Sequence, residues 1–142
     1  MAIYDVAPGL KQGALAHVSQ RWPVEDVDVV LLMADEIEKI PCTVPVFTFS
    51  IADDPHGMPD DEFWRLYATV RLFAPWRVLT VCHMGENRSG LASVMILVAR
   101  GMPVKDAIAT VRRAGPAISV GQPHLFWNPG FAAQVERLLA SA

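Results

Sequence analysis

Residues 82–90 read CHMGENRSG, and the chain changes character on either side of them. The run 77–81 before them is largely apolar, contains β-branched residues and has the length of a buried strand. The run 91–100 after them is also largely apolar and is long enough for a buried helix. In such a strand–loop–helix unit the backbone N–H groups converge on one point, and the helix start adds unpaired N–H groups and a favourable dipole. The stretch therefore predicts a loop that binds an anion.

Two side chains of this loop can act on the anion. Cys82 stands first, and Arg88 follows six residues later. A cysteine at a helix start beside a guanidinium is favoured as the nucleophilic thiolate, and a guanidinium offers a phosphate two parallel donors. Gly85 allows a tight backbone turn under the anion, and Ser89 can donate a hydrogen bond to the departing sulfur. We therefore expect attack on a phosphate monoester held by the backbone amides of His83, Met84, Gly85, Glu86, Asn87 and Arg88.

The order Cys82, five residues, Arg88 and Ser89 resembles the signature of the cysteine-based protein phosphatases. The resemblance extends over most of the chain from about Gly9, and the short length is most similar to the compact dual-specificity branch. It implies hydrolysis of phosphotyrosine, and of phosphoserine or phosphothreonine, through a phosphocysteine intermediate and without a cofactor. One position departs from the signature. The family has a histidine directly before the nucleophile, which helps to order the loop, and this chain has Val81.

The family also uses an aspartate, on a separate loop some thirty residues before the nucleophile, to protonate the leaving oxygen. Asp53 and Asp54 lie 29 and 28 residues before Cys82 and follow a run with strand character. Asp53 keeps the family's step from strand to aspartate, whereas Asp54 precedes the run PHGMP, which is similar to a DHGxP run of the larger tyrosine phosphatases. Aspartates before proline and glycine also shape turns. We expect one of the two to be the general acid and prefer Asp53.

Alternating strand and helix patterns predict one α/β domain over residues 1–142, with a mostly parallel central sheet and helices on both faces. Besides 77–81, strands are expected at 27–33 and at 44–51. Pro45 in the second indicates either an edge position or a strand start. A short turn or helix is expected at Asp35–Lys39, and an irregular segment at 117–127. Asn128 is expected to cap the last helix. The expected helices are 14–21, 62–73, 91–100, 103–113 and 129–142, with Phe63, Tyr67, Val70 and Leu72 on the apolar face of the second.

Residues 115–119 and 128–131 resemble the family segment that backs the catalytic loop, with an insertion at 120–127 between them. The insertion holds His124, Phe126 and Trp127, and it forms either one wall of the pocket or a surface loop packed on the last helix. The sequence does not indicate whether the Glu86 side chain points into the loop, where its carboxylate would repel an anionic substrate, or away from it.

Composition limits the partners. The 142 residues are 52% apolar with a net charge of −3 and no basic patch, which argues against nucleic acid. We expect no leader peptide, because the chain begins with neither a basic nor a long apolar stretch, and no membrane span, because no apolar run is long enough. We expect a reducing cytoplasm, because two cysteines make no disulfide scaffold. The four histidines lack metal-ligand spacing, so no metal site is expected. The expected partner is a phosphorylated protein or a small phosphorylated substrate, and the oligomeric state is not indicated.

Other interpretations stay open. Cys42 is expected to be a small buried side chain, with a reversible disulfide to Cys82 as the alternative. Val81 and Glu86 are compatible with a catalytically weak phosphate-binding module. The same loop also suits another oxyanion, as in arsenate reduction or sulfur transfer. That chemistry needs resolving thiols or a persulfide donor, and Cys42 is the one other thiol of the chain.

Overall fold

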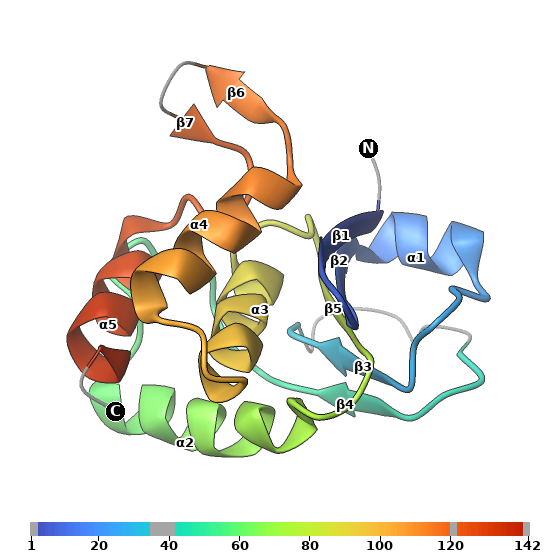
Figure 1. Ribbon diagram of the computed structural model, residues 1–142, viewed down its shortest axis with the longest axis horizontal. Coiled ribbons are helices and arrows are strands. Elements are labelled where there is room, and N and C mark those ends of the chain that lie inside the picture. The colour runs from blue at the N-terminus through green and yellow to red at the C-terminus, as the bar shows by residue number, and fades with distance from the viewer. Residues whose placement is uncertain (1–2, 35–41, 120–121, 141–142) are drawn as a thin grey trace.

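A computed structural model describes residues 3–34, 42–119 and 122–140 of the chain, so the turn or helix expected at Asp35–Lys39 lies outside the described residues. Five strands form one sheet in the spatial order β1-β2-β5-β3-β4 (Figure 1). β1 runs antiparallel to β2, and the other neighbouring strands are parallel. The strands are β1 (Ile3–Ala7), β2 (Leu10–Ala14), β3 (Val29–Leu32), β4 (Val46–Thr48) and β5 (Val78–Cys82).

β5 is the middle strand of the sheet, and all five of its residues are buried. A parallel strand covered on both faces needs a nearly continuous apolar sequence, which explains the run before Cys82. Ligands of open α/β sheets bind at the carboxyl ends of the strands. Cys82, the last residue of β5, therefore stands at the centre of that edge. β4 is an edge strand that begins directly after Pro45, as expected, but it is shorter than the predicted strand at 44–51.

The helices cover both faces of the sheet (Figure 1). Buried side chains form one hydrophobic cluster on the α1 side and a larger one on the opposite side. α3 is the central helix of the larger layer, because its residues from Ser89 to Leu97 are all buried. The predicted class, a mostly parallel α/β sheet flanked by helices on both faces, is confirmed. The helices are α1 (Leu15–Arg21), α2 (Asp60–Val70), α3 (Arg88–Ala99), α4 (Val104–Ala114) and α5 (Pro129–Leu139).

Two regions of extended backbone differ from the prediction. β1 adds an antiparallel edge strand to the sheet. The segment expected to be irregular contains a short antiparallel hairpin of β6 (Ala117–Ser119) and β7 (Gln122–Pro123), which projects from the body of the fold (Figure 1). Such short strands contain too few alternating positions to be recognised from sequence.

The end of α2 corrects one predicted core residue. The helix continues into a 3₁₀ turn, η1 (Arg71–Phe73). Phe63 and Val70 are fully buried as expected, but Leu72 is 64% exposed, so its place on the apolar face is wrong. A 3₁₀ turn has three residues per turn, which rotates Leu72 away from the buried stripe of α2.

The start of α5 confirms its predicted cap: the Asn128 side chain accepts hydrogen bonds from the N–H groups of Gly130 and Phe131. None of the described helices combines the length and the apolar character that a bilayer crossing requires.

Candidate active site

The loop that connects β5 to α3 depends on a glycine. Residues 82–88, called the Cys82 loop below, run from the end of β5 to the first residue of α3. Gly85 has φ +72°, and a Cβ at this position would lie 2.5 Å from the backbone nitrogen of Ala14. Glycine is therefore required for the loop to close against the end of β2. The side chains of His83 and Met84 are exposed, so they point away from the protein body.

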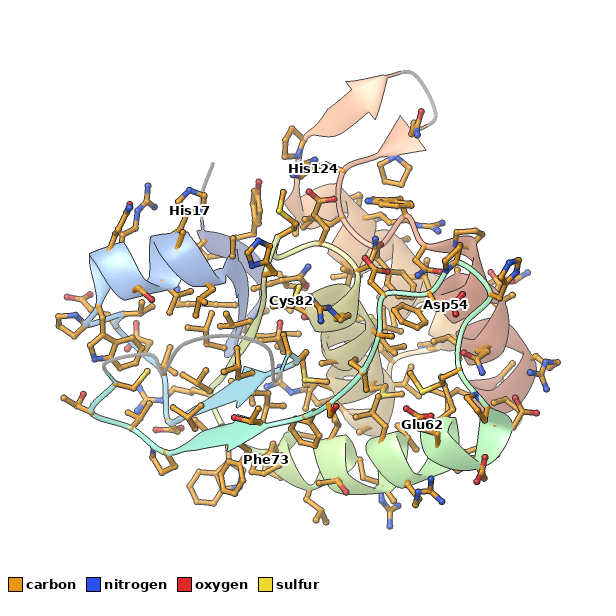
Figure 2. The ribbon with its side chains drawn as sticks, turned by 180° about the vertical axis from the view of Figure 1, so that it is seen from behind. His17, Asp54, Glu62, Phe73, Cys82 and His124 are labelled. Atoms are coloured by element: carbon orange, nitrogen blue, oxygen red, sulfur yellow. The ribbon has the colours of Figure 1, made fainter. Side chains whose placement is uncertain are left out.

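Cys82 lies at the base of this loop with 2% of its surface exposed. Its sulfur is 3.3 Å from the hydroxyl oxygen of Ser89, which is fully buried in the first turn of α3. The first N–H groups of a helix have no partner within the helix and carry its positive end. Figure 2 shows Cys82 at the centre of the molecule, with His124 above it and Asp54 to its right. The surroundings of the sulfur therefore suit an anion.

Arg88 links the Cys82 loop to a second loop. It is the first residue of α3, and its Nη1 donates to the carbonyl oxygen of Ile51 at 3.3 Å. Ile51 stands directly before residues 52–59, called the Asp53 loop below. This contact fixes the guanidinium relative to both loops, which a planar fork needs if it is to bind two oxygens of one anion.

Both carboxylate oxygens of Asp53 accept hydrogen bonds, one from the Cys82 loop and one from the residue that caps α5. Asn87 donates from Nδ2 to Oδ2 at 3.1 Å, and Asn128 donates from Nδ2 to Oδ1 at 2.7 Å. The two asparagines are themselves connected, because the backbone N–H of Asn128 donates to Asn87 Oδ1 at 2.8 Å. The structure therefore brings Asp53 to the loop that begins at Cys82.

Asp54 has a different role. Its Oδ1 accepts the backbone N–H of His56 at 2.8 Å, and its carbonyl accepts the N–H of Gly57 at 2.9 Å. This is the turn chemistry expected of an aspartate before proline and glycine. The side chain of Asp54 is engaged in shaping its own loop, whereas that of Asp53 contacts the Cys82 loop.

The Asp53 loop rests directly on α5. Gln134 accepts the N–H of Met58 at 3.0 Å and donates back to its carbonyl. Gly57, at φ +83°, has no room for a Cβ beside the Gln134 side chain. Arg137 binds the two carboxylate oxygens of Asp60 at 2.7 and 2.9 Å, and these hydrogen bonds lower the pKa of the Asp60 carboxyl. α5 thus fixes the far end of the loop that carries Asp53.

The Glu86 side chain contacts residues that follow β7. Its Oε1 accepts the indole N–H of Trp127 at 2.8 Å, and its Oε2 lies 3.7 Å from His124 Nε2. The side chain is 17% exposed, so these neighbours largely cover it. The residues after β7 therefore contact the Cys82 loop through Glu86.

Sequence reasoning missed the polar side chains that support the site. Asn128 was expected only as a helix cap, and it also binds Asp53. Gln12, Thr80 and Ser93 are fully buried beneath the Cys82 loop, although nothing in their local patterns marks them. In the sequence each of them stands out only as a polar residue within a largely apolar strand or helix. Polar residues are also common at exposed positions of such elements, so this feature does not identify a buried support.

The two cysteines are free and belong to different faces of the sheet. Cys42 packs against the cluster on the α1 side, and Cys82 belongs to the opposite cluster. Burial raises the pKa of the Cys42 thiol, which keeps it protonated at neutral pH. Among the described residues, no group of three histidine, cysteine or acidic side chains is placed to hold a metal ion.

Comparison with known proteins gives matches at the level of structure. No protein-family model matches the chain, and no curated protein matches its sequence. Human DUSP28 superposes with a TM-score of 0.75 at 21% identity, over 98% of this chain and 96% of its own. A mouse putative dual specificity phosphatase complexed with zinc tungstate gives 0.75 at 19% identity, over 95% of this chain and 84% of its own. The human tyrosine phosphatase-like serine/threonine/tyrosine-interacting protein gives 0.68 at 20% identity, over 98% and 96%.

Because these identities are low, the matches show similarity of fold and do not by themselves show a shared activity. They cover between 95% and 98% of this chain. The chain therefore has the compact dual-specificity phosphatase fold of the cysteine-based protein tyrosine phosphatases.

Proposed function

We propose that the chain is a cysteine-dependent phosphatase, a single domain over residues 1–142 that hydrolyses phosphate monoesters. Phosphotyrosine, phosphoserine and phosphothreonine of proteins are the proposed substrate class. The observation that carries the proposal is the hydrogen bond from Asn87 to Asp53, which joins a carboxyl group to the loop that begins at Cys82. Phosphate ester hydrolysis needs a nucleophile, an anion-binding loop and a proton donor within one site. The fold of the structural neighbours supports the same function.

In the first step the Cys82 thiolate attacks phosphorus. A sulfur–phosphorus bond forms as the bond to the ester oxygen breaks, and Asp53 gives its proton to that oxygen. Arg88 and the loop amides bind the equatorial phosphate oxygens, where negative charge is spread in the transition state. The products are an alcohol or phenol and a phosphocysteine.

In the second step water attacks the phosphocysteine. The Asp53 carboxylate takes a proton from the water, and the sulfur–phosphorus bond breaks to release inorganic phosphate. The Ser89 hydroxyl, 3.3 Å from the sulfur, donates a hydrogen bond to the thiolate as it leaves. Neither step uses a cofactor. Oxidation removes a thiolate nucleophile, so a reducing compartment such as the cytoplasm is the proposed location.

Replacing Asp53 with asparagine is expected to lower kcat for p-nitrophenyl phosphate about 100-fold. Nitrophenolate leaves without help from an acid, so the substitution should slow the hydrolysis of the phosphocysteine and not its formation. Stopped-flow absorbance should record a burst of one nitrophenolate per enzyme, followed by slow turnover. The leaving group of a phosphotyrosine peptide needs the proton, so with this substrate no rapid release of the dephosphorylated peptide should precede the slow turnover.

Asp54→Asn is the matched control, because the asparagine side-chain oxygen can still accept the N–H of His56. It should turn over at close to the wild-type rate. A greater loss of kcat in Asp54→Asn than in Asp53→Asn would assign the acid to Asp54, and equal rates in both variants and the wild type would exclude both.

The proposed function is tested by assaying the wild-type protein, in the presence of a thiol reductant, against p-nitrophenyl phosphate and against phosphotyrosine and phosphothreonine peptides. We expect turnover of the aryl ester and of at least one peptide, with inhibition by vanadate. Vanadate binding without turnover of any substrate would instead favour a phosphate-binding module. Arsenate-dependent oxidation of the protein's thiols would favour an oxyanion reductase.

A further inference from the structure

Three fully buried polar side chains lie beneath the Cys82 loop: Gln12 on β2, Thr80 on β5 and Ser93 on α3. β2 and β5 pair in parallel with Gln12 opposite Thr80, and α3 packs on both strands (Figure 1). A buried polar group is unfavourable unless it is hydrogen-bonded. The partners of these three side chains therefore indicate why they are retained in the core.

The shorter of their hydrogen bonds lead toward the Cys82 loop, and Thr80 Oγ1 also lies 3.4 Å from the carbonyl oxygen of Lys11. The Ser93 hydroxyl donates to Gln12 Oε1 at 2.7 Å. This bond uses the single proton of Ser93, so the Thr80 hydroxyl is the donor in the contact of 2.8 Å between the two. Since Gln12 Oε1 faces Ser93, its Nε2 faces the carbonyl oxygens of Gly85, at 3.0 Å, and of Glu86, at 3.3 Å. The chain of hydrogen bonds thus ends on two consecutive carbonyls of the Cys82 loop.

The direction of these carbonyls sets the direction of two N–H groups. A peptide unit is planar and trans, so its carbonyl and its N–H point to opposite sides. The Gly85 carbonyl shares a peptide unit with the N–H of Glu86, and the Glu86 carbonyl shares one with the N–H of Asn87. When Gln12 binds both carbonyls, both N–H groups must point away from Gln12. The N–H of Phe126 holds the Glu86 carbonyl as well, at 3.2 Å.

We propose that Gln12 is a positioning residue for anion binding in the Cys82 loop. It holds the two peptide units so that the N–H groups of Glu86 and Asn87 face the bound phosphate. Ser93, supported by Thr80, binds Oε1 of Gln12 and so keeps its Nε2 directed at the loop carbonyls. This inference rests on the proposed function. It also accounts for a loop that is ordered without a hydrogen-bonding side chain directly before Cys82, where Val81 packs into the cluster on the α1 side.

The test is titration calorimetry of vanadate and inorganic phosphate with the wild type, Gln12→Met and Ser93→Ala. Methionine has a similar volume to glutamine but no donor. We expect the Kd for vanadate to rise about tenfold in Gln12→Met, the equivalent of two lost hydrogen bonds of modest strength, and about threefold in Ser93→Ala. The kcat/KM for p-nitrophenyl phosphate should fall in the same order. Leu139→Ala, a core truncation at the far end of α5, is the stability control and should lower Tm without changing either Kd.

An unchanged vanadate Kd in Gln12→Met, or an equal rise in Leu139→Ala, would overturn the positioning role. If Gln12→Met does not fold, Ser93→Ala decides by the same criterion. The proposed function and the positioning role of Gln12 can be rejected separately. Wild-type protein that binds neither anion would reject the proposed function and this role with it, whereas wild-type and variant proteins that bind vanadate equally would reject this role alone.

Discussion

Replacing Cys82 with serine is expected to lower kcat for p-nitrophenyl phosphate by about 10⁴-fold or more. A serine hydroxyl stays protonated at neutral pH and is a much weaker nucleophile than a thiolate. Serine is close to cysteine in size and can keep the contact with Ser89, so the fold and phosphate binding should be retained. Steady-state kinetics, Tm and phosphate titration on the same preparation separate loss of chemistry from loss of structure.

Cys42→Ser is the matched control for this substitution. Cys42 packs on the opposite face of the sheet, and burial raises the pKa of its thiol, so it is not expected to take part in the reaction. This variant should keep the wild-type rate. Full activity in Cys82→Ser, or loss of activity only in Cys42→Ser, would refute the assignment of the nucleophile.

Replacing Arg88 with lysine is expected to lower kcat/KM about 10³-fold, even though the positive charge is kept. A guanidinium can bind two phosphate oxygens at once, whereas an ammonium is a compact point charge. Lysine would also lose the fixed geometry that comes from the hydrogen bond to the Ile51 carbonyl. The Kd for vanadate should rise together with the loss of kcat/KM.

The exposed Arg65 on α2, which pairs with Asp61 one helical turn away, provides the control Arg65→Lys. Surface ion pairs of this kind contribute little, so its kinetics should match those of the wild type. A loss of less than about tenfold in Arg88→Lys would mean that charge alone suffices, and the two-point binding of phosphate would be wrong.

The Cys82 loop and its flanking elements could be predicted because the signals are local. The buried strand, the loop and the buried helix are consecutive in the chain, and Gly85 marks the tight turn between them. The sequence supports only a preference for Asp53 over Asp54, since both have suitable spacing. The hydrogen bonds that distinguish them come from Asn87 and Asn128, which lie 34 and 75 residues from Asp53 in the sequence.

The position of Gln12 beneath the Cys82 loop could not be predicted from the sequence either. Gln12 stands 73 residues before Gly85, and its position under the loop depends on the pairing of β2 with β5. Long-range pairing of this kind leaves no local pattern. The direction of the Glu86 side chain likewise depends on Trp127, in a segment whose hairpin was itself not predicted.

The proposed mechanism requires a covalent bond between the sulfur of Cys82 and phosphorus during turnover. Asp53→Asn is the suitable protein for testing it, because nitrophenolate leaves readily while hydrolysis of the intermediate is slow. The protein is mixed with p-nitrophenyl phosphate, quenched in acid, digested with trypsin and analysed by mass spectrometry. We expect the peptide 78–88 to gain the mass of one phosphoryl group on Cys82, and its counterpart in Cys82→Ser to gain none. A nitrophenolate burst with no phosphoryl group on this peptide, or with the group on another residue, would contradict this mechanism.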